Sequence, residues 1–120
     1  MKKILIVEDN ALNRALLLAV LKPKGFEILS VENGLQGVEV AQRELPDLIL
    51  MDVMLPGLNG YEATRRLKSD PTTQHIPIIA ITANAAPTER DRALDAGCDG
   101  YIAKPIDTRA LPDLVQLFLR

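Results

Sequence analysis

The sequence predicts an α/β domain in which helices cover both faces of a five-stranded parallel sheet. Short apolar runs alternate five times with segments of helical periodicity, and this alternation is typical of doubly wound parallel sheets. The runs at 4–7 and 48–51 are apolar without interruption, as in strands that are buried on both faces. The strand order 2-1-3-4-5 suits five strands and makes the first and third strands neighbours.

The first half of the chain supplies three strands and two helices. After the strand at 4–7, Asn10 is a suitable cap for a helix with one apolar stripe of Leu12, Leu16, Ala19 and Val20. Residues 28–31 form a shorter apolar run flanked by acidic residues, which indicates an edge strand. The second helix precedes the central strand. Four of its side chains are expected to face the core: Leu35, Val38, Ala41 and Leu45.

The second half supplies two more strands, at 76–82 and 101–103, and three helices. Asn59 is expected to cap the first of these helices and Thr88 the second. Pro112 lies close to the start of the last helix, where an interior proline would remove a backbone hydrogen bond. The last helix therefore either begins just before this proline or has an irregular first turn.

The composition excludes several classes of protein. The 120 residues suit one hydrophobic core. With 48% apolar and 25% charged residues the chain has the balance of a soluble globular domain. Fourteen basic and sixteen acidic residues give a net charge of -2, which disfavours direct binding of nucleic acid or of a lipid surface. The single cysteine, Cys98, excludes an internal disulfide. The first apolar run is too short for a signal peptide or a membrane span, so we expect a cytoplasmic protein.

Four of the five predicted strands end in a chemically reactive group: Glu8-Asp9, Asp52, Thr82 and Lys104. In a parallel sheet these ends meet at one edge, where open α/β sheets bind their ligands. Three carboxylates that lie close together need a counter-charge, or one of them keeps its proton. Oxygen ligands without histidine or cysteine indicate Mg²⁺, with Mn²⁺ as an alternative.

Such a group of residues suits phosphoryl transfer. Asp52 would attack phosphorus and form an acyl phosphate, while Lys104 and Thr82 would surround the phosphoryl group with a positive charge and a hydroxyl donor. Each residue alone would be an ordinary cap, turn residue or surface charge. Their occurrence at separate strand ends favours a site.

The chain resembles a receiver domain of the bacterial response-regulator family, and the resemblance covers nearly its whole length. The segments that carry the resemblance are Ile6-Val7-Glu8-Asp9-Asn10, Leu50-Met51-Asp52-Val53-Met54-Leu55-Pro56, Ile81-Thr82-Ala83 and Tyr101-Ile102-Ala103-Lys104-Pro105. The family has the flavodoxin-like (βα)5 fold, in agreement with the alternation of strands and helices.

The resemblance implies a role for each of these positions. Asp52 would be the phosphoacceptor, and Mg²⁺ would be bound by Asp9, Asp52 and the backbone carbonyl of Met54, with Glu8 acting mostly through a metal-bound water. Lys104 and the amide of Ala83 would bind the phosphate, together with Thr82. The Lys104–Pro105 peptide is expected to be cis.

The resemblance also implies a switch, in which Thr82 moves toward the phosphate and Tyr101 turns inward. The alternative for Tyr101 is an edge-strand aromatic residue with its hydroxyl in water. Met54 and Asn84 occupy positions that tune the lifetime of the phosphoryl group in the family, and the lifetime does not follow from the residue types.

The implied function is that of a phosphoacceptor domain in a two-component system or phosphorelay. Its donor would be a histidine kinase or a histidine phosphotransfer protein, and its output would be contact with a downstream effector protein. We expect residues 1–120 to form one receiver domain without an output domain, either a single-domain regulator or part of a longer chain. Three leucines lie off the expected stripe of the first helix and would pack on the last helix or dock the donor: Leu17, Leu18 and Leu21.

Two other functions compete with this interpretation. Phosphatases that form an aspartyl phosphate usually carry a second Asp two residues after the nucleophile, and here that position is Met54. We therefore expect an acceptor and switch with slow self-dephosphorylation at most, and no enzyme of high turnover. A flavodoxin-like cofactor binder needs an anion-binding loop after the first strand, where this chain has Glu8-Asp9-Asn10.

Overall fold

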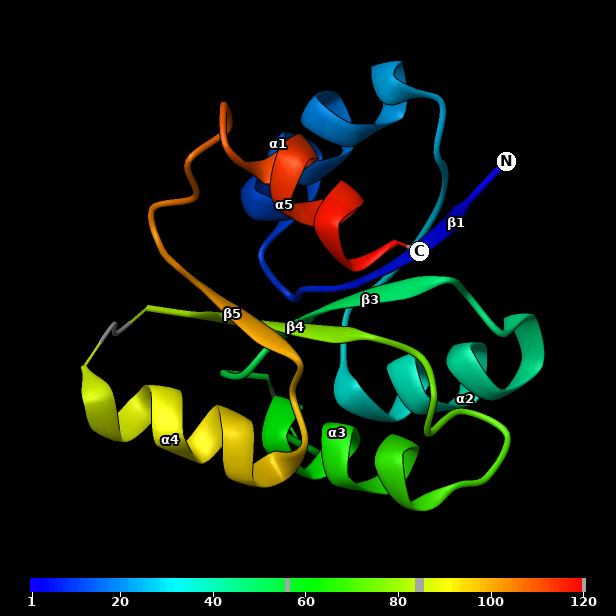
Figure 1. Ribbon diagram of the computed structural model, residues 1–120, viewed down its shortest axis with the longest axis vertical. Helices are drawn as coiled ribbons and strands as arrows, with labels where there is room; N and C mark the ends of the chain where they lie inside the picture. The colour runs from blue at the N-terminus through cyan, green and yellow to red at the C-terminus, as the bar shows by residue number, and fades with distance from the viewer. Residues whose placement is uncertain (56, 84–85, 120) are drawn as a thin grey trace.

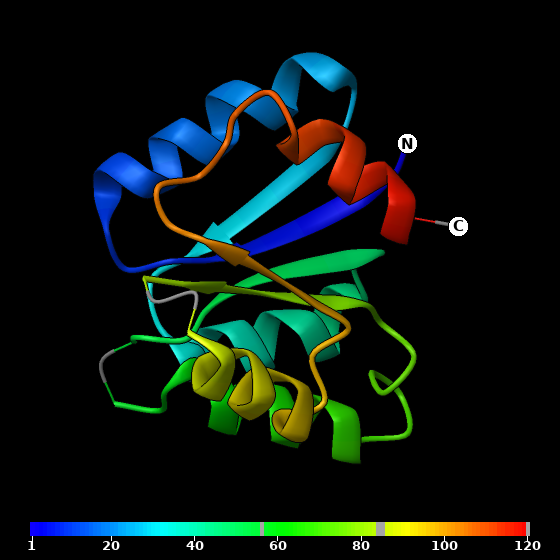
Figure 2. The same cartoon turned by 60° about the vertical axis from the view of Figure 1, so that its left-hand side comes forward.

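The computed structural model describes residues 1–55, 57–83 and 86–119. A parallel sheet of five strands, in the order β2-β1-β3-β4-β5, lies between two layers of helices. Helices α1 and α5 cover one face, and α2, α3 and α4 cover the other, as Figures 1 and 2 show. The predicted fold class and strand order are confirmed. The strands are β1 (Lys3–Val7), β2 (Glu27–Val31), β3 (Leu48–Asp52), β4 (Ile78–Thr82) and β5 (Gly100–Ala103); the helices are α1 (Ala11–Leu21), the short 3₁₀ helix η1 (Lys22–Lys24), α2 (Gly34–Glu44), α3 (Gly60–Ser69), α4 (Pro87–Ala96) and α5 (Leu111–Phe118).

The uninterrupted apolar runs form the centre of the sheet because each residue of these strands contacts one of the two helical layers. In β3 all five residues are buried. Its side chains alternate: Leu48 and Leu50 pack in the cluster under α1 and α5, whereas Ile49 and Met51 pack in the cluster under α2, α3 and α4. The predicted edge strand β2 is confirmed, and its residues are exposed or only partly buried.

Helix α1 buries a different stripe from the predicted one. Leu17 and Leu21 are fully buried and share a cluster with Leu111 and Val115 of α5. Leu12, in contrast, is 81% exposed and Leu16 is 38% exposed. Because apolar residues surround almost the whole helix, several stripes fit the periodicity equally well, and packing against α5 selects the buried one.

Helix α2 also departs from the prediction in part. Val38 and Ala41 are buried, but Leu35 and Leu45 are about half exposed, at 53% and 50%. Leu45 is the C-cap of α2 and has a left-handed backbone with φ of 47°. This conformation ends the helix, so the apolar periodicity cannot continue through it.

The helix ends follow local signals with one exception. Asn10, Asn33 and Asn59 each cap a helix by accepting a hydrogen bond from the backbone N–H three residues later. Thr88 was predicted to cap α4, but the helix begins at Pro87, which suits a first helical position. The last helix begins at Leu111, just before Pro112, so the first of the two predicted alternatives is confirmed.

Candidate phosphoacceptor and metal site

The strand register brings the predicted residues to one edge of the sheet. Val7 pairs with Met51, so Glu8 follows β1 beside the end of β3 at Asp52. Farther along the same edge, Thr82 pairs with Ala103, the residue that precedes Lys104. The convergence predicted from parallel topology is therefore present in the structure.

Three acidic side chains form the centre of this edge. Glu8, Asp9 and Asp52 each offer a carboxylate oxygen, and these oxygens lie within 4.8 Å of one another. Glu8 and Asp52 are buried, at 0% and 2% exposure, while Asp9 is open to solvent. Two buried carboxylates at this distance from each other require a positive partner.

Lys104 supplies part of that positive charge. Its Nζ donates a hydrogen bond of 3.0 Å to Asp52 Oδ2 and lies 3.6 Å from Glu8 Oε2. Burial lowers the pKa of Lys104, but the hydrogen bond to Asp52 and the charges of Asp52 and Glu8 outweigh this effect, so the net shift of the pKa is upward. The lysine is therefore held as a cation.

One ammonium group does not neutralise three carboxylates. Burial and the neighbouring Asp52 raise the pKa of Glu8 to about 7, against the opposing effects of the Asn10 N–H and of Lys104. Within the described part of the chain, Glu8 Oε2 is a buried side-chain oxygen without a hydrogen-bond partner. A buried carboxylate oxygen that accepts no hydrogen bond and lies close to two other carboxylates fits a hard divalent cation such as Mg²⁺.

The loops around the acids hold them in place through backbone groups. The Asn10 N–H donates to Glu8 Oε1 at 3.2 Å, and the Met54 N–H donates to Asp52 Oδ1 at 2.9 Å. Met54 itself is 72% exposed. The turn after Asp52 therefore wraps its own backbone around the carboxylate.

The remaining predicted residues lie at the end of the neighbouring strands. Thr82 is the last residue of β4 and is buried, and Ala83 follows it at the exposed edge. The Lys104 N–H donates to the Thr82 carbonyl at 2.7 Å, which joins the ends of β4 and β5. The Lys104–Pro105 peptide is cis, as predicted. Asn84 and Pro56 lie outside the described residues.

Tyr101 lies on β5 opposite Ala80, two residues before the end of β4 at Thr82. The ring is partly buried against the cluster under α2, α3 and α4. The ring contacts the core while the residue keeps some exposure. Tyr101 is therefore neither fully turned inward nor fully on the surface. The predicted inward turn of Tyr101 stays a prediction.

Two sets of contacts next to the site were not predicted from the sequence. Arg14 Nη1 donates to the Glu8 carbonyl at 2.9 Å. Tyr61 of α3 donates from its hydroxyl to Glu89 Oε2 of α4 at 2.6 Å, and the Arg92 guanidinium stacks 4.7 Å from the centroid of the Tyr61 ring. Tyr61, Glu89 and Arg92 line a hollow of about 510 Å³, and Thr82 and Ala83 also form part of its wall.

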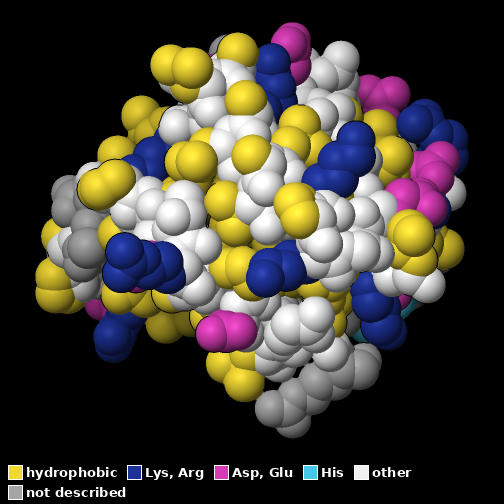
Figure 3. All heavy atoms as spheres, turned by 90° about the horizontal axis from the view of Figure 1, so that it is seen from above, with side chains coloured by type: hydrophobic (Ala, Val, Ile, Leu, Met, Phe, Trp, Pro, Cys, Tyr) yellow, Lys and Arg dark blue, Asp and Glu magenta, His cyan; other side chains and the backbone are white. Residues whose placement is uncertain are grey.

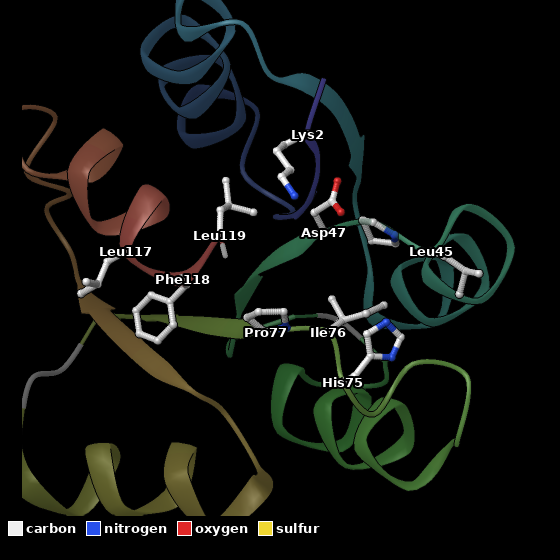
Figure 4. A pocket seen from close by; sticks show the side chains of 10 residues that line it. Lys2, Leu45, Asp47, His75, Ile76, Pro77, Leu117, Phe118 and Leu119 are labelled. Carbon is white, nitrogen blue, oxygen red and sulfur yellow. The ribbon is translucent and has the colours of Figure 1, made fainter.

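A second hollow lies at the opposite edge of the sheet and belongs to no predicted site. It measures about 600 Å³ and is lined by apolar side chains such as Ile76, Pro77 and Phe118, with Lys2, Asp47 and His75 at its rim (Figure 4). His75 was predicted to have no role, and it lies far from the acidic cluster because it precedes β4 instead of following it.

The match to a protein-family profile covers nearly the whole chain: residues 4–116 fit the response regulator receiver domain. The chain belongs to this family. It is a receiver domain of the kind used in two-component and phosphorelay signalling. A curated relative, the polar-differentiation response regulator DivK of Brucella anthropi, is 40% identical over 118 residues, which are 98% of this chain and 96% of the relative.

Solved structures give the same result. The receiver domain of the sensor histidine kinase PA1611 from Pseudomonas aeruginosa is 40% identical, with a TM-score of 0.92 and coverage of 98% of this receiver domain and 97% of that chain; it holds a magnesium ion in its active-site cleft. The receiver domain of Ssk1 from Saccharomyces cerevisiae, solved with the histidine phosphotransfer protein Ypd1, is 28% identical, with a TM-score of 0.92 and coverage of 98% and 88%. None of the helices in the described parts of this receiver domain has the length and apolar character of a membrane span.

Proposed function

We propose that this receiver domain accepts a phosphoryl group on Asp52 from a phosphorylated histidine of a kinase or of a phosphotransfer protein. The observation that carries the proposal is the arrangement of Asp52, which is buried close to the carboxylate of Glu8 and paired with the ammonium group of Lys104 at the open edge of the sheet. A carboxylate held in this way is a nucleophile with a fixed direction of attack.

The acidic cluster suits Mg²⁺, which Asp9, Asp52 and the Met54 carbonyl would hold, with the Glu8 carboxylate close by. When bound, the ion would neutralise the carboxylates and the incoming phosphoryl oxygens. Mn²⁺ has the same preference for oxygen ligands and would substitute for it. The magnesium ion in the cleft of the PA1611 receiver domain supports this assignment.

In the transfer step, an Asp52 oxygen forms a bond to phosphorus as the phosphorus–nitrogen bond of the donor histidine breaks. The electron pair of that bond stays on the imidazole ring, which leaves as neutral imidazole if its other nitrogen carried a proton. Lys104 stays protonated and would pair with a phosphoryl oxygen, and the Ala83 N–H and the Thr82 hydroxyl would donate to the others. No residue needs to move a proton at phosphorus.

The domain is proposed to act as an acceptor and switch, not as an enzyme of high turnover. The exposed thioether of Met54 occupies the position where aspartyl-phosphate phosphatases carry their general acid. Thr82 and Tyr101 are proposed to change position after phosphorylation, because a new dianion beside Lys104 alters the charge at the ends of β4 and β5. Residues 1–120 would then act as one receiver domain whose output is contact with an effector protein.

Helix α1 is the proposed contact for the donor. Its first two turns expose Leu12 and Leu16, with Ala15 between them, directly after the loop that carries Glu8 and Asp9. Figure 3 looks onto the face formed by α1 and α5 and shows hydrophobic side chains with basic ones among them. An apolar helix stripe of this kind suits the helical bundle that carries the histidine of a donor, and the Ssk1 receiver domain solved with Ypd1 supports a donor of this class.

The test is the intact mass of the protein after incubation with acetyl phosphate and Mg²⁺. The wild type should gain one phosphoryl group, which is lost when EDTA is present from the start, and Asp52→Asn should gain none. A full adduct on Asp52→Asn would refute the proposal. The matched variant Leu12→Ser should accept phosphate from acetyl phosphate normally but lose transfer from phosphorylated histidine kinases or phosphotransfer proteins.

A further inference from the structure

Arg14 connects helix α1 to the loop that carries two of the three acids. Its Nη1 donates a hydrogen bond of 2.9 Å to the backbone carbonyl of Glu8. Its Nη2 lies 3.2 Å from Glu32 Oε1, just beyond the end of β2. The Arg14 side chain is only 18% exposed, and Leu17 and Leu21 anchor its helix in the core. The guanidinium group is therefore held at both of its ends.

The carbonyl that Arg14 contacts belongs to the peptide group that joins Glu8 to Asp9. Fixing the orientation of this peptide fixes the directions in which both acidic side chains leave the backbone. Two other hydrogen bonds of the loop act at different points: the Glu8 N–H donates to the Val31 carbonyl before this peptide, and the Asn10 N–H donates to the Glu8 carboxylate itself.

Arg14 and Lys104 place positive charge beside the site in different ways. Lys104 contacts the carboxylates of Asp52 and Glu8, so it competes with a cation for the same oxygens. Among the described residues of the site, Arg14 bonds the Glu8 backbone oxygen and no carboxylate, and its other nitrogen is directed to Glu32. It can therefore hold the loop against the mutual repulsion of the acids and leave their oxygens available to a metal ion.

We propose that Arg14 is a positioning residue for the divalent-cation site. By fixing the peptide between Glu8 and Asp9, it orients the two acidic side chains that would bind the cation. This inference rests on the proposed function. Loss of a group that orients metal ligands typically weakens metal binding by about tenfold or more. Loss of an exposed ion pair has a smaller effect, and Glu32 is 68% exposed. The hydrogen bond to the carbonyl, and not the ion pair, should carry the effect.

The experiment is titration of the full chain with Mg²⁺ by calorimetry. Arg14→Met should raise the dissociation constant about tenfold, and Glu32→Gln should change it by less than about threefold. Lys68→Met is the matched control, because Lys68 also donates to backbone carbonyls, those of Gln74 and Ile76, and pairs with Asp99. Its contacts precede β4 and β5, at the end of the sheet away from the site, so this variant should bind Mg²⁺ as the wild type does.

A kinetic measurement separates positioning from general damage to the fold. Phosphorylation of Arg14→Met by acetyl phosphate should need about tenfold more Mg²⁺ for half-maximal rate but reach the wild-type rate at saturation. If Arg14→Met does not fold, Arg14→Lys, which keeps the charge but carries its donors on a single nitrogen, should give an intermediate affinity. Wild-type affinity in these variants, or an equal loss in Lys68→Met, would overturn the inference while the proposed function stands. Absence of Mg²⁺ binding by the wild type would overturn both.

Discussion

Lys104 donates a 3.0 Å hydrogen bond to Asp52, a residue 52 positions away in the chain. The contact exists because β3 and β5 end at the same edge of the sheet, on either side of β4. It occupies one of the two carboxylate oxygens of Asp52, Oδ2, with an ion pair to the lysine. Lys104 is thus paired with Asp52 in this structure, and an incoming phosphoryl group would compete with Asp52 for the ammonium group.

Replacing Lys104 should therefore have opposite effects on metal binding and on phosphorylation. In Lys104→Met the carboxylates lose a competing cation, so calorimetry should show Mg²⁺ affinity equal to or greater than that of the wild type. The phosphoryl group loses a charge-assisted donor, and phosphorylation by acetyl phosphate should slow by about tenfold or more. Mass spectrometry over time measures the rate. A variant that loses Mg²⁺ affinity as well would show that Lys104 supports the metal ligands instead of competing for them.

Glu8 should make the metal-free protein less stable as the pH rises. Burial raises its folded-state pKa to about 7 from the ordinary value of 4.5. A carboxyl group with a raised pKa binds its proton more tightly in the folded state, so its contribution is fully present below pH 4.5 and is lost as the pH rises through 7. Glu8→Gln, which mimics the protonated form, should unfold in urea with a free energy about 1–3 kcal/mol higher than the wild type at pH 8, and most of this difference should be gone at pH 5.

Magnesium supplies the control for this prediction. Saturating Mg²⁺ at pH 8 should stabilise the wild type more than Glu8→Gln, because the cation removes the cost of the buried charge in the wild type alone. An advantage of Glu8→Gln that is the same at pH 5 and pH 8 would contradict the assignment of the effect to ionisation.

The Tyr61 hydroxyl should ionise only at strongly alkaline pH. Burial, followed by the hydrogen bond to Glu89, raises the pKa of Tyr61 to about 12. The chain has two tyrosines and no tryptophan, so ultraviolet absorbance follows both hydroxyls without interference. The wild type should show one tyrosine that ionises only near pH 12, and Tyr61→Phe should lack it. The stability that this hydroxyl contributes is present below pH 10 and is lost as the pH rises through 12. A tyrosine transition near pH 12 that survives in Tyr61→Phe would contradict the assignment.

The fold could be predicted from the sequence because its central strands are apolar on both faces and end at charged or turn residues. The phase of α1 could not be predicted in this way. Leucines at 12, 16, 17, 18 and 21 surround the helix, and only the packing of Leu17 and Leu21 on α5 shows which of them are buried. The start of α4 was also missed, because Pro87 favours a first helical position more strongly than Thr88 favours a cap.

Much of the site could be predicted for a similar reason. Parallel strands convert an order along the chain into an order along one edge, so Asp9, Asp52 and Lys104 had to meet there. The contacts of Arg14 and Tyr61 depend on details that topology does not determine. Arg14 bonds a backbone carbonyl, which every residue has, and Tyr61 reaches a glutamate 28 residues away on another helix. Neither partner has a residue type or spacing that would single it out.

Gly60 should be required for the position of Asp52. It is the first residue of α3, and a Cβ atom there would lie 2.7 Å from Val53 Cα and against the Asp52 carbonyl. These are backbone atoms, so neither can rotate away. Gly60→Ala should therefore force the end of β3 to shift, lowering the free energy of unfolding by about 1–3 kcal/mol and weakening Mg²⁺ binding. Gly25→Ala is the control: its φ of 88° is costly for alanine, yet nothing lies within 4 Å of the added methyl group, so it should lower stability by about 1 kcal/mol and leave Mg²⁺ affinity unchanged. Equal losses of Mg²⁺ affinity in both variants would attribute the effect to stability and not to the contact with Asp52.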